Sequence, residues 1–207
     1  MGSAKPIIGL CGGIGAGKSV VAREFERLGG LLIDSDQLNH EVLRRPEVAK
    51  TLREWWGDGV LDTHGIVDRR RVAELVFKDA EQKRRLESLV HPLIATLREN
   101  IISSGIGDPK VRAIILDSPL LLESKLDRLC YTVIFVEASE ACRLRRLQRI
   151  RGWDMRELRR REQWQLSVAE KRARSRHVIK NEGALEQLRS QARDLFERIL
   201  EEHASNQ

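Results

Sequence analysis

The sequence predicts an α/β fold in which a mostly parallel, five-stranded sheet carries helices on both faces. Five short apolar runs have the length of buried strands, and they lie at residues 7–11, 31–33, 111–117, 131–137 and 177–179. The segments between these runs have the apolar spacing of helices, so strands and helices alternate along the chain. The first two runs flank a glycine-rich loop and a helix, which makes a βαβ unit. Such alternation is typical of a parallel sheet covered on both faces.

The first and last helices of the chain have clear sequence boundaries. The first is expected to begin near Lys18 and to end at Gly29 and Gly30, because glycine commonly follows the last helical turn. The last is expected over residues 184–204. Its apolar stripe consists of Leu185, Leu188, Ala192, Leu195, Phe196 and Ile199.

The region between the second and third strands is expected to be mostly helical, from Gln37 to about Gly107. Pro46 suits the first turn of a helix, where its missing N–H is not needed. His91–Pro92 is expected to mark a helix boundary or a kink, since the residue before proline avoids the helical conformation. Residues 105–109, GIGDP, are expected to form a loop.

Composition narrows the class of protein. The chain has 207 residues, 41% hydrophobic, which suffices for one α/β domain with a substantial core. No apolar run approaches the roughly 20 residues of a membrane span, and the start has no signal-peptide pattern, so no membrane partner is expected. Three cysteines, an odd number without a CxxC, indicate a reducing compartment, and we expect a cytoplasmic protein.

The net charge of +6 has two interpretations. A basic surface could bind nucleic acid, or arginines could bind the phosphates of a small ligand, because a guanidinium group holds phosphate oxygens in a bidentate fork. The arginines are concentrated between Arg143 and Arg161, whereas acidic and basic residues are interspersed elsewhere. Aromatic residues make up only 4% of the chain, so platforms for base stacking are scarce. No nucleic-acid partner is therefore expected.

The glycine-rich loop predicts a nucleotide-phosphate site. Gly12, Gly17, Lys18 and Ser19 fit the P-loop pattern G-x-x-x-x-G-K-[ST] without a mismatch. Glycines allow several backbone N–H groups to point at one anion, and the helix that follows adds its positive end. Lys18 is expected to reach the β and γ phosphates of ATP, and Ser19 to bind Mg²⁺. The expected nucleotide-binding residues are Gly13, Ile14, Gly15, Ala16, Gly17, Lys18, Ser19 and Val20.

Two carboxylate positions follow predicted strands. Asp34 and Asp36 end the second strand, and Asp117 ends the third. Because ligands bind at the carboxyl ends of parallel strands, one of the first pair is expected near the phosphates, and Asp117 is expected to orient Mg²⁺. Alternatively, Asp36 caps the next helix and Asp117 belongs to a simple turn. A GTPase role is excluded, because the sequence has no base-reading NKxD.

Several segments together resemble the dephospho-CoA kinase family. They are GLCGGIGAGKS, LIDSDQLNHEVL, GDGVLDTHGIVDRRRVAELVF, LESLVHP, LDSPLLLE and WQLSVAEKRARSRHVIKNEG, in this order and over nearly the whole chain. The resemblance implies phosphorylation of the ribose 3′-hydroxyl of 3′-dephospho-CoA by ATP with Mg²⁺, giving CoA and ADP, by a monomer or small homo-oligomer. A rival is another small P-loop kinase that acts on a nucleoside monophosphate or a small alcohol. A rival from another class is a nucleotide-regulated nucleic-acid binder.

The resemblance also implies a division of the chain into parts. Residues 1–207 would form a single P-loop kinase domain with a core at about 1–36, 110–145 and 175–207. A helical insertion at about 37–109 would hold the CoA substrate. An arginine-rich lid segment, residues 146–174, would close over the phosphates.

Individual roles follow from the same resemblance. Asp36 matches the catalytic base, Lys18 contacts the phosphates, and Arg145 and Arg149 match arginines that neutralise the transferred phosphoryl group. Positions on the substrate side are matched by His40, His91, Pro92, Leu121, Arg161 and Gln165, and Asn181 matches an adenine-side position. A packed or capping role is the alternative for either histidine. The chain departs from the family pattern at Cys11 and Val20, where threonine is common, and at Ser175–Arg176, where Ala-Asp is usual.

Overall fold

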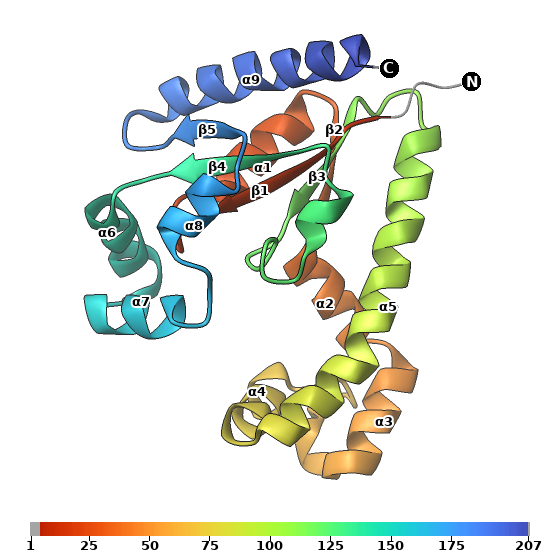
Figure 1. Ribbon diagram of the computed structural model, residues 1–207. Coiled ribbons are helices and arrows are strands. Elements are labelled where there is room, and N and C mark those ends of the chain that lie inside the picture. The colour runs from red at the N-terminus through yellow and green to blue at the C-terminus, as the bar shows by residue number, and fades with distance from the viewer. Residues whose placement is uncertain (1–4, 207) are drawn as a thin grey trace. The chain divides into compact units, whose positions relative to one another are not determined.

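The computed structural model describes residues 5–206, which form two compact units (Figure 1). The sheet unit comprises residues 5–34 and 103–206, and the helical unit comprises residues 35–102. Each unit has a hydrophobic core of its own.

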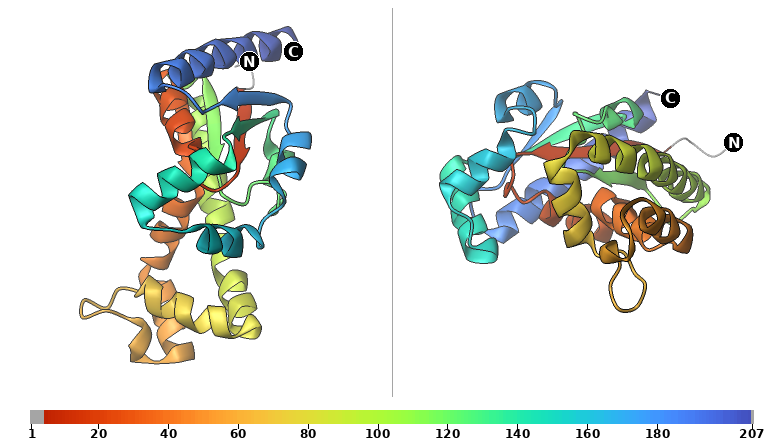
Figure 2. Two further views of the ribbon diagram at one scale, coloured as in Figure 1. Left: turned by 90° about the vertical axis from the view of Figure 1, so that its left-hand side faces the viewer. Right: turned by 90° about the horizontal axis from the view of Figure 1, so that it is seen from below.

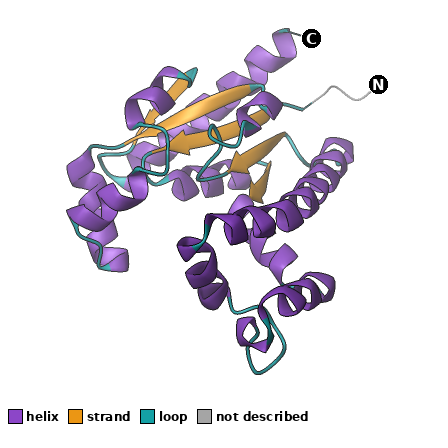
Figure 3. Cartoon of the chain, turned by 60° about the horizontal axis from the view of Figure 1, so that its bottom comes forward, coloured by secondary structure: helices purple, strands orange, loops and turns teal. Residues whose placement is uncertain are grey.

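The sheet unit is built on five strands in the order β2-β3-β1-β4-β5, and Figure 3 shows them gathered in one sheet. The strands are β1 (Ile7–Gly12), β2 (Gly30–Asp34), β3 (Ala113–Asp117), β4 (Thr132–Glu137) and β5 (His177–Lys180). All four neighbouring pairs are parallel. The predicted α/β class and the five predicted strands are therefore confirmed, with boundaries shifted by one or two residues.

One face of the sheet is covered by α1 (Lys18–Arg27) and α9 (Leu185–Ser205), which lie side by side in Figures 1 and 2. Ile8 and Leu10 of β1 pack against this pair, and the rings of Phe25 and Phe196 are 5.1 Å apart between the two helices. The stripe predicted for the last helix is buried, except that Leu185 is 48% exposed in the first turn.

The second face of the sheet carries alternate residues of the same strand, as the two-residue period of a strand requires. A side-chain carbon added to Gly9 would lie 2.7 Å from Leu121 Cδ2, and Cys11 contacts the backbone of α8 (Val168–Ala173). The remaining helices of this unit are η2 (Leu126–Leu129), α6 (Glu140–Arg151) and α7 (Met155–Glu162). Helices and loops thus cover both faces, as predicted.

The helical unit has a core formed by its own helices. These are α2 (Ser35–Leu43), α3 (Pro46–Trp56), η1 (Asp58–Val60), α4 (Arg69–Lys78) and the first part of α5 (Ala80–Gly107). Val42, Leu52 and Val60 are among its buried residues. Pro46 occupies the first turn of α3, as predicted.

The structure corrects two predictions about α5. Of the boundary or kink expected at His91–Pro92, the boundary is absent, because α5 continues through Pro92. The helix also continues through residues 105–107, which were expected in a loop. A side-chain carbon on Gly105 would lie 2.5 Å from Leu31 Cδ2, so this turn of α5 packs tightly on the sheet. Tertiary packing here overrides the local preference of glycine for turns.

Candidate active site

The glycine loop joins the carboxyl end of the inner strand β1 to the start of α1. From β1 the chain continues toward the β2 edge of the sheet, whereas from the neighbouring β4 it continues toward the β5 edge. The loop therefore lies at a topological switch point, where open parallel sheets bind ligands. Gly15 (φ 79°) and Gly17 (φ 94°) have left-handed backbone conformations, and Gly17 is the residue before the first helical turn. The loop therefore has the expected strand–loop–helix setting of a phosphate site.

Neighbouring groups leave no space for side chains on several loop glycines. A side-chain carbon on Gly13 would lie 2.8 Å from Arg143 Nη1, and one on Gly17 would lie 2.2 Å from Asn181 Nδ2. One on Gly12 would lie 2.6 Å from the carbonyl oxygen of Val136. The glycines thus allow α6 and the segment after β5 to approach the loop backbone closely.

Two arginines of α6 hold the loop from outside. Arg143 is almost fully buried, and its Nη1 donates to the carbonyl oxygen of Ile14 at 3.0 Å. Arg146 donates through Nη1 to the carbonyl oxygen of Ala16 at 3.2 Å, and through Nη2 to that of Asn181 at 2.6 Å. These contacts hold the carbonyl groups of Ile14 and Ala16, and the N–H of Ala16 donates to the carbonyl oxygen of Gly13 at 3.0 Å within the loop.

Arg145 and Arg149, the two arginines predicted for the transferred phosphoryl group, lie on the exposed side of α6. The loop is contacted instead by Arg143 and Arg146, which the sequence analysis does not single out. A local signal for them exists, because Arg143, Arg146 and the buried Leu147 have the i, i+3, i+4 spacing of one helix face.

Asn181 connects the loop to the last strand. Its side-chain Nδ2 donates to the carbonyl oxygen of Ala16 at 2.7 Å, and its backbone N–H donates to that of Glu137 at 2.7 Å. The side chain is buried. The structure thus brings Asn181 to the predicted nucleotide loop, in contact with Arg146.

Oxygen ligands for a divalent cation lie at the same edge of the sheet. Asp117 is buried at the end of β3, and its backbone is paired with Leu10 on one side and with Asp34 on the other. Ser19 is exposed in the first turn of α1. Among the described residues, no group of three or more His, Cys, Asp or Glu residues could hold a metal by itself. Mg²⁺ is commonly bound by one or two protein oxygens together with phosphates and water, and these residues fit that arrangement.

The helical unit contains four of the predicted site residues, which are Asp36, His40, His91 and Pro92. Asp36 is exposed in the first turn of α2, which begins at Ser35, so Asp36 does not occupy the capping position before the helix. His40, His91 and Pro92 are also exposed. Neither histidine is therefore a packed core residue, which was one of the two alternatives for both, beside a capping role.

The lid segment contains α7, and two of its predicted residues make contacts within the protein. Arg161 donates from Nε to Glu157 Oε1 at 2.6 Å, and its guanidinium lies 4.2 Å from the centre of the Trp153 ring. Gln165 Oε1 accepts a hydrogen bond from Lys171 Nζ at 2.7 Å. Leu121, which precedes the lid in the chain, is buried over Gly9.

An ion pair to which the sequence assigns no role joins the buried Lys171 to the half-buried Glu123, whose Nζ and Oε1 atoms are 3.0 Å apart. Both lie in segments that carried the family resemblance, and only their long-range contact reveals the pair. Beside it, Cys11 Sγ is 3.1 Å from Ser175 Oγ, so two of the positions that depart from the family pattern contact each other. Burial raises the pKa of the Cys11 thiol.

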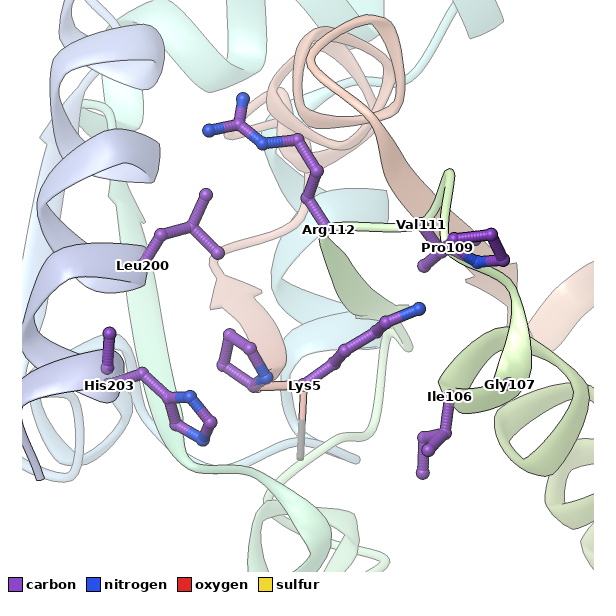
Figure 4. Close-up of a pocket in the computed structure, with 10 residues that line it drawn as sticks. Lys5, Ile106, Gly107, Pro109, Val111, Arg112, Leu200 and His203 are labelled. Atoms are coloured by element: carbon purple, nitrogen blue, oxygen red, sulfur yellow. The ribbon is translucent and has the colours of Figure 1, made fainter. Parts of the chain in front are cut away.

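A cavity of about 450 Å³ lies at the other end of the sheet (Figure 4). Its lining includes Pro6 and Val111, which precede β1 and β3, whereas the glycine loop follows the carboxyl end of β1. Its cations make contacts within the protein, because Lys5 donates to the carbonyl oxygen of Gly105 and Arg112 forms two hydrogen bonds with Glu197. The cavity therefore does not belong to the candidate active site.

Comparison with known proteins supports a kinase. The sequence model of the family described as dephospho-CoA kinase matches residues 6–187. A dephospho-CoA kinase of Mycobacterium tuberculosis (strain ATCC 25618 / H37Rv) is 36% identical over 200 residues, which cover 96% of this chain and 48% of that protein. The chain thus spans about half the length of this mycobacterial relative.

Two further proteins match over nearly their whole length. A dephospho-CoA kinase of Syntrophotalea carbinolica is 33% identical over 196 residues, which cover 94% of this chain and 92% of that protein. The structure of TT1252 from Thermus thermophilus superimposes with a TM-score of 0.79 at 33% identity, and the match covers 94% of this chain and 98% of that one. By its loop, its sheet topology and these matches, the chain belongs to the dephospho-CoA kinase family.

Proposed function

We propose that the chain transfers the γ-phosphoryl group of ATP to the 3′-hydroxyl of 3′-dephospho-CoA, giving CoA and ADP, the last step of coenzyme A synthesis. The observation that carries this proposal is the intact phosphate loop at the carboxyl end of β1, in a chain that matches the family over residues 6–187. The loop is the evidence for phosphate binding, and family membership is the evidence for the identity of the acceptor.

The loop and α1 bind the phosphates of ATP in this proposal. Backbone N–H groups of the loop and the positive end of α1 would face the phosphate oxygens, and Lys18 would reach the β and γ phosphates. Ser19 and Asp117 would hold Mg²⁺, which neutralises charge on the phosphates when bound. Asn181 and Arg146, joined by hydrogen bonds, would border the adenine side.

Asp36 accepts the proton of the acceptor hydroxyl in this proposal. The 3′-oxygen forms a bond to the γ-phosphorus while the bond from that phosphorus to the β–γ bridging oxygen breaks, and the electron pair leaves with ADP. Only one residue separates Asp36 from the last residue of β2, and its exposed carboxylate is accessible to a substrate. A carboxylate is a suitable general base for this step.

The residues proposed to contact the acceptor belong to two parts of the chain. His40, His91 and Pro92 lie exposed in the helical unit, and Arg161 and Gln165 lie in the lid segment. Arg145 and Arg149 are exposed, so they are available to neutralise the transferred phosphoryl group when the lid segment closes. Closure would also keep water from competing with the hydroxyl group.

The cellular setting is also part of the proposal. Among the described residues, no helix combines the length and the apolar character that a membrane crossing requires. Cys11, Cys130 and Cys142 are free thiols, which suits a reducing compartment. We place the enzyme in the cytoplasm, as a monomer or small homo-oligomer.

The test is ADP release from ATP and Mg²⁺ with 3′-dephospho-CoA, AMP and adenosine assayed side by side, with CoA measured as product. Turnover restricted to 3′-dephospho-CoA is expected. Turnover with AMP alone would keep the kinase core and overturn the acceptor. Lys18→Ala is the control, because loss of the phosphate-binding ammonium group should reduce turnover by about 10² or more.

A further inference from the structure

A buried ion pair on the second face of the sheet lies outside the machinery described so far. The side chain of Lys171, in α8, is only 2% exposed, and its Nζ lies 3.0 Å from Glu123 Oε1. The same ammonium group donates to Gln165 Oε1 at 2.7 Å. One buried charge thus contacts both a carboxylate and a residue that the proposed function places at the substrate.

Glu123 also holds the lid segment directly. Its Oε1 accepts the backbone N–H of Leu166 at 2.8 Å. Its other oxygen, Oε2, is buried without a hydrogen-bond partner in the described part of the chain. The carboxylate therefore fixes Leu166 by a hydrogen bond and Lys171 by an ion pair, both near the carboxyl end of the lid segment.

The same cluster reaches the strand that leads into the phosphate loop. The carbonyl oxygen of Lys171 accepts from Ser175 Oγ at 2.8 Å and lies 3.9 Å from Cys11 Sγ. Cys11 is the residue before Gly12, and Glu123 lies in the segment that follows Asp117 at the end of β3. The cluster therefore joins the phosphate-loop strand, the segment after β3 and the end of the lid segment.

We propose that Glu123 and Lys171 are positioning residues that set the orientation of Gln165 and the attachment of the lid segment; this inference rests on the proposed function. A buried ion pair is weak support for stability, because apolar residues of similar volume often replace such pairs without loss. What apolar residues cannot replace is the hydrogen bond that holds Gln165. The pair therefore affects acceptor binding by fixing the orientation of the Gln165 side chain.

The experiment compares Lys171→Met, Glu123→Gln and the double variant with the wild type. Each single variant leaves one charged group without its oppositely charged partner, so the melting temperature of that variant should fall. The double variant has neither charge, so its melting temperature should recover most of that loss. Its kcat/KM for 3′-dephospho-CoA should nevertheless stay about 10-fold to 100-fold below the wild type, because a methionine side chain in place of Lys171 cannot donate to Gln165. The loss should appear in the KM for 3′-dephospho-CoA, with the KM for ATP unchanged.

Glu24→Gln is the matched control. Glu24 is a buried carboxylate on the opposite face, 3.6 Å from Arg189 and 3.2 Å from Arg27, and its substitution should lower the melting temperature without changing either KM. Gln165→Ala, which keeps the ion pair, should reproduce the rise in KM for 3′-dephospho-CoA. This variant tests the inference even if the ion-pair variants fail to fold.

The outcomes separate the two proposals. A double variant whose kinetics recover together with its stability would show a purely structural pair and overturn the inference, as would a Gln165→Ala variant with normal KM values. The proposed function would stand in both cases. A folded wild-type protein without turnover of 3′-dephospho-CoA would instead overturn the proposed function, and the inference with it.

Discussion

Gly17 shows how one residue meets two separate constraints. Its φ of 94° is in the left-handed region, and an added side-chain carbon would lie 2.2 Å from Asn181 Nδ2. The first constraint is a property of the backbone, and the second depends on a residue far away in the sequence. A matched pair of glycine variants can separate them.

Gly17→Ala is expected to abolish ATP binding and to lower the free energy of unfolding by about 1 kcal/mol or more. Gly152→Ala is the control, because Gly152 has a similar backbone (φ 67°) with open space around it. The control should lose stability through the backbone alone and keep its ATP affinity. Calorimetric titration with ATP measures the difference, and equal affinities for the two variants would contradict the steric account of Gly17.

Asp36→Asn tests the proposed base. The amide has nearly the same shape but cannot take up the proton, so turnover should fall by about 10² or more with ATP affinity retained. Asp58→Asn, which removes a surface carboxylate paired with Arg53 in the same helical unit, should leave turnover unchanged. Steady-state kinetics at saturating ATP is the measurement, and near-normal turnover of Asp36→Asn would remove Asp36 from the mechanism.

The buried thiol of Cys11 and the half-buried thiol of Cys130 should react slowly with alkylating reagents. Burial raises the pKa of Cys11, and burial together with the negative charge of Asp127 raises the pKa of Cys130 to about 12. Since the thiolate is the reactive form, little of it is present in either residue near pH 8. Mass spectrometry after iodoacetamide treatment should find both unmodified in the folded protein and labelled after unfolding in guanidinium. Equal rates in the two states would contradict this.

At the scale of elements, α6 supports the phosphate loop from one side. Arg143, Arg146 and Leu147 lie against the loop, and Arg145 and Arg149 are exposed. Because a helix turns by 100° per residue, one segment presents arginines both to the loop and to the solvent. The two groups should therefore have different effects on kinetics.

Arg146→Ala is expected to weaken ATP binding by about tenfold, because two loop and strand-end carbonyls lose a charged donor. Arg149→Ala should instead lower kcat with ATP affinity retained, if the lid arginines act on the transferred phosphoryl group. Arg193→Ala, an exposed arginine of α9, is the control for loss of charge. ATP dissociation constants and kcat are measured for all three, and an unchanged affinity in Arg146→Ala would contradict the loop-support role.

At the scale of the whole molecule, nucleotide binding couples to the stability of the sheet unit. The loop, α6 and Asn181 all belong to this unit, so we expect ATP to bind only when these distant segments are folded together. At an ATP concentration of 100 times Kd, mass action should add about 2.7 kcal/mol to the free energy of unfolding. The melting temperature should rise by roughly 5–10 °C.

Differential scanning calorimetry with and without ATP and Mg²⁺ measures this shift. Lys18→Ala is the control and should show little or no rise, because it lacks the ammonium group that binds the phosphates. A shift of equal size in Lys18→Ala would mean that ATP binds elsewhere on the protein.

The sequence by itself determined the features that depend on neighbouring residues. The glycine loop with Lys18 and Ser19, the alternation of strands with helices and the buried stripe of α9 were all predicted, because each is a spacing within one segment. The loop expected at residues 105–109 is instead helical as far as Gly107. Local rules disfavour a helix at Gly105, and the packing of Gly105 on the sheet outweighs them.

Only the tertiary structure decided which distant residues meet. Arg143 and Arg146 were not distinguished from the other arginines of α6, because the position of that helix on the loop depends on the order of strands in the sheet. The pair of Glu123 with Lys171 likewise depends on packing between separate segments. Pairing between distant segments is a property of the folded chain, and the spacing within one segment does not identify the residue that it will meet.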